Sequence, residues 1–179
     1  MVVYVSVFAA ILVLLGDFSY IRGIIKGSII PTKSTWIIFS IVTALNVSSF
    51  MTVKFDVVSG LYSISDFFLC VLILVTALVY SRKEKIVFKT FEKYYLAGSF
   101  ICLMFWLAFS DPFITNLLAQ SLIAIGYIPT MHNLIVTKES HESRFVWTIW
   151  ILGSVFAMYP AIANQNLLAL IYSARALVM

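Results

Sequence analysis

Long apolar runs, each bounded by a short polar or charged segment, occupy almost the whole chain. A helix of about 20 apolar residues is long enough to cross the hydrocarbon core of a bilayer. Seven runs of roughly this length lie at residues 3–25, 34–52, 57–80, 94–109, 112–136, 145–163 and 164–179. They leave only short connecting loops and no room for a separate soluble domain. We therefore expect an all-α integral membrane protein with seven transmembrane helices.

Composition agrees with this expectation. Hydrophobic residues make up 62% of the chain and charged residues 11%, and the mean hydropathy is +1.03, far from the values of soluble domains. Cys70 and Cys102 both fall inside apolar runs, so we expect buried thiols rather than a disulfide. The first run has neither a basic leader nor a small-residue cleavage site, and we interpret it as a retained span.

The basic residues indicate how the spans are oriented. With the N-terminus outside, eleven of the twelve Lys and Arg residues fall on the inner side: Arg22, Lys26, Lys33, Arg82, Lys83, Lys85, Lys89, Lys93, Lys138, Arg144 and Arg175. Only Lys54 remains outside, as the positive-inside rule predicts. This bias requires an odd number of spans, and Pro160 with residues 164–166 separates the last two. We expect a cytoplasmic C-terminus and a location in the plasma membrane, which in a bacterium is the inner membrane.

A weak internal repeat divides the chain. A shift of about 110 residues, with one inserted residue, superposes Gly16 on Gly126, Trp36 on Trp147 and Tyr62 on Tyr172. The first three and the last three runs then point the same way, so the repeat is parallel and the fourth run is its linker. The sequence predicts two parallel three-helix bundles, at residues 1–81 and 111–179, joined by a charged inner loop and linker helix at residues 82–110.

Residues 126–150 form the better preserved part of this repeat. They contain the sequence GYIP, a polar turn at residues 138–144 and a second apolar helix that opens on Trp147 and Trp150. Proline inside a membrane helix leaves a backbone carbonyl unpaired, and glycine and proline both favour a bend. We interpret Gly126 and Pro129 as the hinge of a moving helix, with a static kink as the alternative.

The 3+1+3 plan, together with the pattern GYIP…K-x-S…W, resembles the PQ-loop family, which includes the SWEET sugar facilitators and the KDEL receptors. Bacterial carriers of vitamin precursors such as nicotinamide riboside are similar in architecture. Thr130 stands where the family motif has glutamine, and Ser19 stands where the first copy would have proline. The resemblance implies a transporter that works by alternating access between its two bundles.

Polar residues share one face on each of two predicted helices. On residues 57–80 this face carries Ser59, Tyr62, Ser63, Asp66 and Cys70, and on residues 112–136 it carries Asn116, Gln120, Tyr127 and Met131. A polar face inside a bilayer must meet protein or water. We interpret Tyr62, Ser63, Asn116, Gln120 and Tyr127 as lining a solute pathway, with tight helix packing as the alternative.

Three further substrate-binding candidates lie on other helices. The flat ring of Trp150 can bind the apolar face of a sugar or a heteroaromatic base, and Asn46 is its polar complement. Tyr172 matches Tyr62 in the repeat. The resemblance to SWEET proteins implies an asparagine on the third helix of each bundle, where this chain has residues such as Asp66 and Tyr172 instead. The substrate class therefore stays open.

Two acidic residues lie inside the predicted spans. An ionised carboxylate near the middle of a bilayer costs a few kcal/mol, so Asp66 is either a group that binds substrate or couples protons, or a structural carboxyl. Asp17 is a second candidate for proton coupling, with Tyr20 and Arg22 as local partners. Counting at 1.5 Å per residue sets Asp17 about 9 Å nearer the inner face, so we do not expect a close acid pair.

No catalytic residue, metal site or cofactor is predicted. The sequence lacks H-E-x-x-H and G-x-S-x-G, and His132 and His141 have no further ligand at a suitable spacing.

The main alternative to a transporter is a receptor or sensor that binds a small ligand or peptide without moving it. A retinal protein, which is one such receptor, would need a lysine in the last run. A purely structural subunit is a further alternative. Expected partners are a small-molecule substrate and the lipid bilayer, not nucleic acid, and a homo-oligomer is compatible with the sequence.

Overall fold

A computed structural model describes residues 1–52, 57–80, 86, 88, 90–136 and 144–175, and of residues 127–136 and 144 it describes only the backbone. Across this part of the chain the protein is helical and contains no strand. The helices are α1 (Val2–Lys26), α2 (Lys33–Met51), α3 (Val57–Tyr80), α4 (Thr90–Phe109), α5 (Pro112–Val136), α6 (Arg144–Ala163) and α7 (Leu167–Arg175). The all-α prediction is confirmed.

Four of these helices are long and apolar enough to cross a membrane: α1, α2, α3 and the part of α6 at Phe145–Ala163. The stretch Pro112–Gly126 of α5 is a shorter apolar helix. The described part of α7 has nine residues, which rise about 14 Å, compared with about 30 Å for a hydrocarbon core. These helices suit a membrane-embedded protein. Four of them have the length and hydropathy of a membrane span among the described residues, so the count of seven spans stays a prediction.

Side chains are distributed as in a protein surrounded by lipid. Phe100, Ile101 and Leu107 of α4 are between 61% and 67% exposed. Asn46 and Asn116, by contrast, are 1% exposed. A soluble protein would keep its amides at the surface and its large apolar side chains inside. The reversed pattern fits a bundle whose outer face meets acyl chains and whose polar groups must pair internally.

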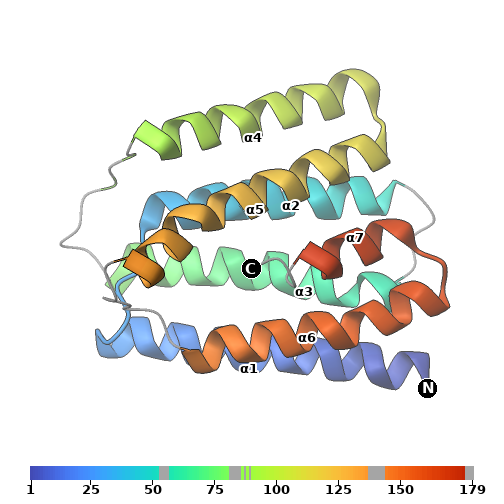
Figure 1. Cartoon of the computed structure of the whole chain (residues 1–179), viewed down its shortest axis with the longest axis horizontal. Coiled ribbons are helices and arrows are strands. Elements are labelled where there is room, and N and C mark those ends of the chain that lie inside the picture. Colours follow the sequence, from blue (N-terminus) through green and yellow to red (C-terminus); the bar gives the residue numbers. More distant parts are fainter. Residues whose placement is uncertain (53–56, 81–85, 87, 89, 137–143, 176–179) are drawn as a thin grey trace.

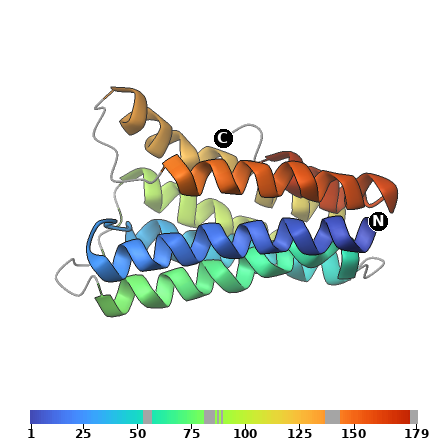
Figure 2. The ribbon, with the colours of Figure 1, turned by 90° about the horizontal axis from the view of Figure 1, so that it is seen from below.

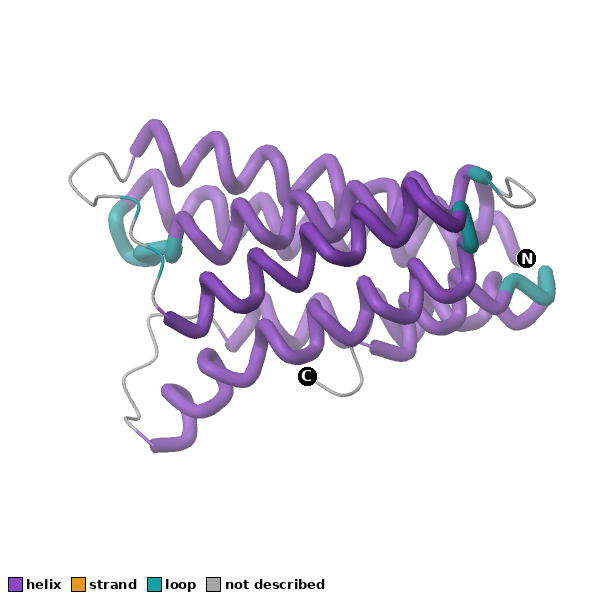
Figure 3. The backbone as a smooth tube through the Cα atoms, turned by 90° about the horizontal axis from the view of Figure 1, so that it is seen from above, coloured by secondary structure: helices purple, strands orange, loops and turns teal. Residues whose placement is uncertain are grey.

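The helices lie side by side in one elongated bundle (Figure 1). Helix α3 contacts both α1 and α2, and α7 contacts both α5 and α6. Across the bundle α1 packs on α6, α2 on α5 and α3 on α7. Figures 2 and 3 show the same packing from below and from above. Figure 1 also shows α1 running in the same direction as α5, α2 as α6, and α3 as α7.

Local sequence explains where α5 and α7 begin. The carboxylate of Asp111 accepts the backbone N–H of Ile114 at 3.0 Å, and Pro112 occupies the first helical position, which suits its missing N–H. The side chain of Asn166 caps α7 by accepting the N–H of Ala169 at 3.0 Å. Gln165 before it has a φ of 52°. Helix α6 continues through Pro160, so the break between α6 and α7 falls after this proline.

Helix α4 lies at the edge of the bundle and contacts both α2 and α5. Glu92 in its first turn accepts the hydroxyl of Ser34 on α2 at 2.6 Å and that of Thr35 at 3.4 Å. On the α5 side, the ring of Tyr95 lies directly on Gly126, where an added Cβ would come within 2.5 Å of the tyrosine oxygen. A polar contact therefore attaches α4 to α2, and a close glycine contact attaches it to α5.

Candidate binding site

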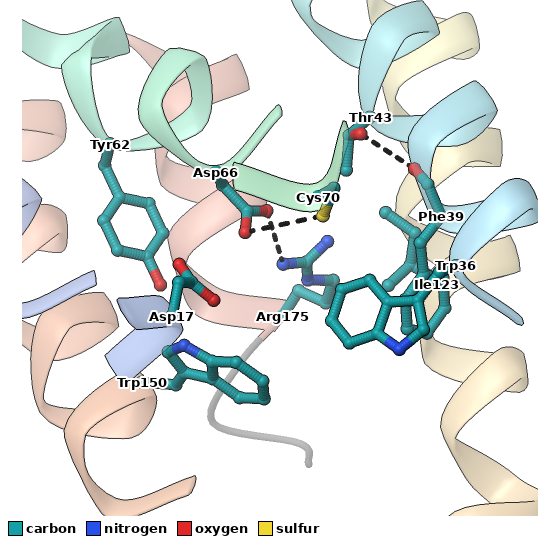
Figure 4. A pocket seen from close by; sticks show the side chains of 10 residues that line it. All are labelled: Asp17, Trp36, Phe39, Thr43, Tyr62, Asp66, Cys70, Ile123, Trp150 and Arg175. Carbon is teal, nitrogen blue, oxygen red and sulfur yellow. Dashed lines mark hydrogen bonds and ion pairs between the residues drawn. The ribbon is translucent and has the colours of Figure 1, made fainter. Parts of the chain in front are cut away.

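A cavity lies in the middle of the bundle, between helices from both halves of the chain (Figure 4). Every helix except α4 contributes to its lining: Asp17, Trp36, Phe39, Thr43, Tyr62, Asp66, Cys70, Ile123, Trp150 and Arg175. About 40 Å³ of it is open to the centre of a water molecule. That space holds a few waters, so a solute the size of a sugar enters only if the helices move apart.

Asp66 on α3 is the most connected group of this cavity. The hydroxyl of Tyr172 on α7 donates to its Oδ2 atom, and the thiol of Cys70 lies 3.9 Å from Oδ1. The guanidinium of Arg175 forms an ion pair with Asp66, with Nη2 3.8 Å from Oδ2. The predicted polar face of α3 thus places Tyr62, Asp66 and Cys70 on the cavity.

Arg175, at the end of α7, is the functional candidate that sequence reasoning missed. The count of basic residues places it on the inner side of the membrane, and in the structure its side chain is only 8% exposed and lies in the cavity. Its Nη1 atom donates to the Oε1 atom of Gln120 at 3.3 Å, and its guanidinium sits 4.6 Å from the ring centre of Tyr172. The helical spacing of three residues between Tyr172 and Arg175 was the available signal, because it places both on one face. The positive-inside bias of the other basic residues does not depend on Arg175.

Three amide side chains extend the polar contacts of Asp66 and Arg175 away from the cavity. Asn46 on α2 accepts two hydrogen bonds at its Oδ1 atom, from Asn116 at 2.5 Å and from Gln120 at 2.7 Å. Asn46, Asn116 and Gln120 are all at least 95% buried. The Oδ1 atom of Asn116 has no hydrogen-bond partner among the residues that the structure describes. The three predicted binding residues thus form one cluster, and Gln120 joins it to Arg175.

Asp17 on α1 lines the same cavity as Asp66. Both acids therefore face one cavity, and the expectation that they do not form a close acid pair stays a prediction. Asp17 is 2% exposed. The indole nitrogen of Trp150 points toward its carboxyl group (Figure 4). Its Oδ2 atom has no hydrogen-bond partner in the described part of the chain.

Tyr62 and Tyr172, the matched tyrosines of the repeat, meet at the contact between α3 and α7. Their rings pack edge to face with centres 5.8 Å apart. The hydroxyl groups of Tyr62 and Ser154 are 2.6 Å apart and share a hydrogen bond. Ser63 is buried, but its hydroxyl donates to the backbone oxygen of Gly60 at 3.0 Å, within its own helix. Ser63 therefore does not join the other predicted residues at the cavity.

Aromatic rings form one wall of the cavity. Trp150, a predicted binding residue, lines it together with Trp36 and Phe39. Tyr20 supports this wall, with its ring centre 5.3 Å from that of Trp36 and 5.9 Å from that of Trp150. Trp36 is 7% exposed and lies in the cavity lining.

The proposed hinge is described only in part. Helix α5 is continuous across residues 126–136, and Gly126 lies against Tyr95. The side chains of Tyr127 and Pro129 lie outside the described residues, as do those of His132 and His141. The hinge and the contribution of Tyr127 to the pathway therefore stay predictions.

Comparison of the chain with models of protein families, with curated proteins and with solved structures found no match.

Proposed function

We propose that this protein is a membrane carrier that moves a small polar solute through the centre of the helix bundle. The observation that carries the proposal is a continuous chain of buried polar and charged side chains that contact one another across the helix bundle. It runs from Asn116 through Asn46 and Gln120 to Arg175 and Asp66. Buried polar and charged groups are costly within a bilayer, and they are a frequent mark of substrate and ion pathways.

The chemistry of the path suits a solute with several hydrogen-bonding groups. Amide, hydroxyl and guanidinium groups supply donors, and the two carboxylates supply acceptors. An apolar ring surface of the solute can pack against the aromatic wall of the cavity. This combination is compatible with a sugar, a vitamin precursor or a similar small molecule.

The arrangement of the helices supports alternating access between two helix triplets. Helix α3 packs between α1 and α2, α7 packs between α5 and α6, and matched helices run in the same direction. The cavity lies where these two sets meet, with Tyr62 and Tyr172 in contact across the boundary. A rocking motion of one set against the other would open the cavity to each side in turn. In this proposal the chain spans the membrane seven times, with its N-terminus outside.

Uptake into liposomes tests the proposal. Purified protein is reconstituted, and the entry of labelled sugars, vitamin precursors and amino acids is followed over time. Asn46→Ala removes the acceptor shared by Asn116 and Gln120, and an unsatisfied buried polar group costs about 1–3 kcal/mol of free energy. Because a cost of this size raises the barrier to transport, we expect the rate of uptake to fall about tenfold or more. Ser48→Ala is the matched control, because the Ser48 hydroxyl is exposed and bonds only within α2. Asn46→Asp keeps the acceptor if the alanine variant unfolds.

Two results would overturn the carrier proposal. The first is the absence of uptake for every solute while the protein remains folded. The second is specific binding of a ligand, seen as a rise in thermal stability, without any flux. The second result would favour the receptor or sensor alternative. Proton coupling through Asp17 or Asp66 is tested separately, by asking whether Asp17→Asn or Asp66→Asn removes the dependence of uptake on an imposed pH gradient.

A further inference from the structure

The charged groups of the central cavity do not balance. Its lining contains the carboxyl groups of Asp17 and Asp66 and the guanidinium of Arg175. Arg175 pairs with Asp66 and donates to Gln120. The carboxyl group of Asp17 forms no ion pair with any described residue. An unpaired buried carboxylate is costly, and this cost is offset by a positive charge placed beside it.

The surroundings of Asp17 favour a ligand as the source of that charge. The residue is 2% exposed, it lines the cavity, and its Oδ2 atom is without a hydrogen-bond partner in the described chain. The charged and titratable groups that line the cavity with it are Asp66, Tyr62 and Cys70 from α3 and Arg175 from α7. The hydroxyl of Tyr62 is already bonded to Ser154, and Arg175 is held by Asp66. Asp17 therefore places on the cavity lining a carboxyl group with one buried acceptor oxygen that receives no hydrogen bond from the described chain.

Aromatic rings lie beside this oxygen. Trp150 contacts Asp17 through its indole nitrogen, and Trp36 and Phe39 complete the wall. The rings of Trp36 and Phe39 are perpendicular, with centres 5.8 Å apart, and Tyr20 holds the two tryptophans together. Aromatic faces attract cations, most strongly where water is excluded.

We propose that the cavity binds a small organic cation, an ammonium ion or a flat cationic ring. Its positive charge lies on the carboxylate of Asp17, and its apolar surface lies against Trp150, Trp36 and Phe39. This inference rests on the proposed carrier function for the route by which the ligand enters, because the present cavity admits only a few waters. Sugars and other neutral solutes leave the charge of Asp17 unmatched and bind more weakly.

The test compares cations with neutral molecules of the same shape. Tetramethylammonium, choline, benzyltrimethylammonium and N-methylpyridinium are each titrated by calorimetry into detergent-solubilised protein, alongside the isostere in which carbon replaces the charged nitrogen. We expect at least one cation to bind about tenfold or more tightly than its isostere. Asp17→Asn is expected to reduce that ratio to near one. Glu92→Gln is the control, since it removes a buried carboxylate on α4, outside the cavity.

The proposal is overturned if no cation binds the wild-type protein more tightly than its isostere, a result that does not depend on any variant folding. It is also overturned if the preference survives in folded Asp17→Asn protein. Failure of this inference is distinct from failure of the carrier function. Uptake of neutral solutes without a preference for cations would contradict only the cation site, whereas cation binding without uptake would contradict only the carrier.

Discussion

At the scale of single residues, Asp66 and Arg175 hold opposite charges inside an apolar bundle. The side chain of Asp66 is 22% exposed and that of Arg175 is 8% exposed. Removing one partner of such a pair leaves the other buried without compensation, which is usually more damaging than removing both. Tyr172 adds a hydrogen bond to the acid and a ring face to the cation. These contacts fix how α3 and α7 face each other.

A double-mutant cycle measures this coupling. We expect Asp66→Asn and Arg175→Gln each to destabilise the protein, and the double variant to lose less than the sum of the two. The expected coupling is about 1–3 kcal/mol, typical of contacting residues in one polar network. Unfolding of the four proteins in the same detergent gives the value. Strictly additive effects would mean that the two charges do not stabilise each other.

The residue scale is also where sequence reasoning was least complete. The spacing on α3 was sufficient to place Tyr62 and Asp66 on one face, and both lie on the cavity. The count of basic residues assigns Arg175 to the inner side from its position in the chain, and that position says nothing about which way a long side chain points. Trp36 likewise lies in the cavity lining. Tryptophan is common at membrane surfaces, but packing against Tyr20 holds this one in the core.

At the scale of elements, periodicity and turn residues predicted the helices well. The predicted bounds of 57–80 and 112–136 coincide with α3 and α5. Helix α4 begins at Thr90, earlier than the predicted residue 94, because Glu92 in its first turn finds hydroxyl partners on α2. Ser34, one of these partners, lies 58 positions away from Glu92 in the chain. A tertiary contact of this kind leaves no local signal, so the charged turn was read as a loop.

Two glycines of the α4–α5 contact form a matched pair for substitution. Gly126→Ala would push a methyl group into the Tyr95 ring, at 2.5 Å from its oxygen and 2.6 Å from Cζ. Gly98→Ala would meet only the Cδ2 end of Leu122, at 2.8 Å. We expect Gly126→Ala to cost about 1–3 kcal/mol through overpacking, and Gly98→Ala clearly less, because a leucine end can rotate away.

Thermal unfolding of the two glycine variants makes the comparison. Tyr95→Ala in the Gly126→Ala background should recover part of the loss caused by the methyl group, beyond what Tyr95→Ala does alone. Equal losses for the two glycine variants would show that Tyr95 moves as easily as Leu122, and that this contact does not fix the position of α4.

At the scale of the whole molecule, the sequence indicated a membrane-embedded helical protein, and the structure bears out that much. The site depends on relations that no single helix encodes. Asp17 and Asp66 share a cavity because of how α1 and α3 are placed along each other. Asn46 reaches Asn116 and Gln120 because α2 packs on α5. Pattern analysis could name most of these residues, but packing alone decides which of them meet.

The predicted orientation can be tested by labelling. In a background with Cys70→Ala and Cys102→Ala, a single cysteine is introduced at Ser28 or at Lys54. A membrane-impermeant maleimide added to intact cells should label Lys54→Cys, and should label Ser28→Cys only after the membrane is permeabilised. The reverse pattern would place the N-terminus inside, and labelling of both sites in intact cells would rule out a membrane span at α2.

Helix α4 has a mechanical consequence for any motion of the bundle. It is attached to α2 by Glu92 and to α5 by the contact of Tyr95 with Gly126. A rotation that separates the two sets of helices cannot leave both attachments in place. The hydrogen bonds of Glu92 can break and reform with water at the end of the helix, whereas the ring on the glycine can only slide. In the proposed alternating-access motion, we therefore expect α4 to release its contact with α2 and to move together with α5.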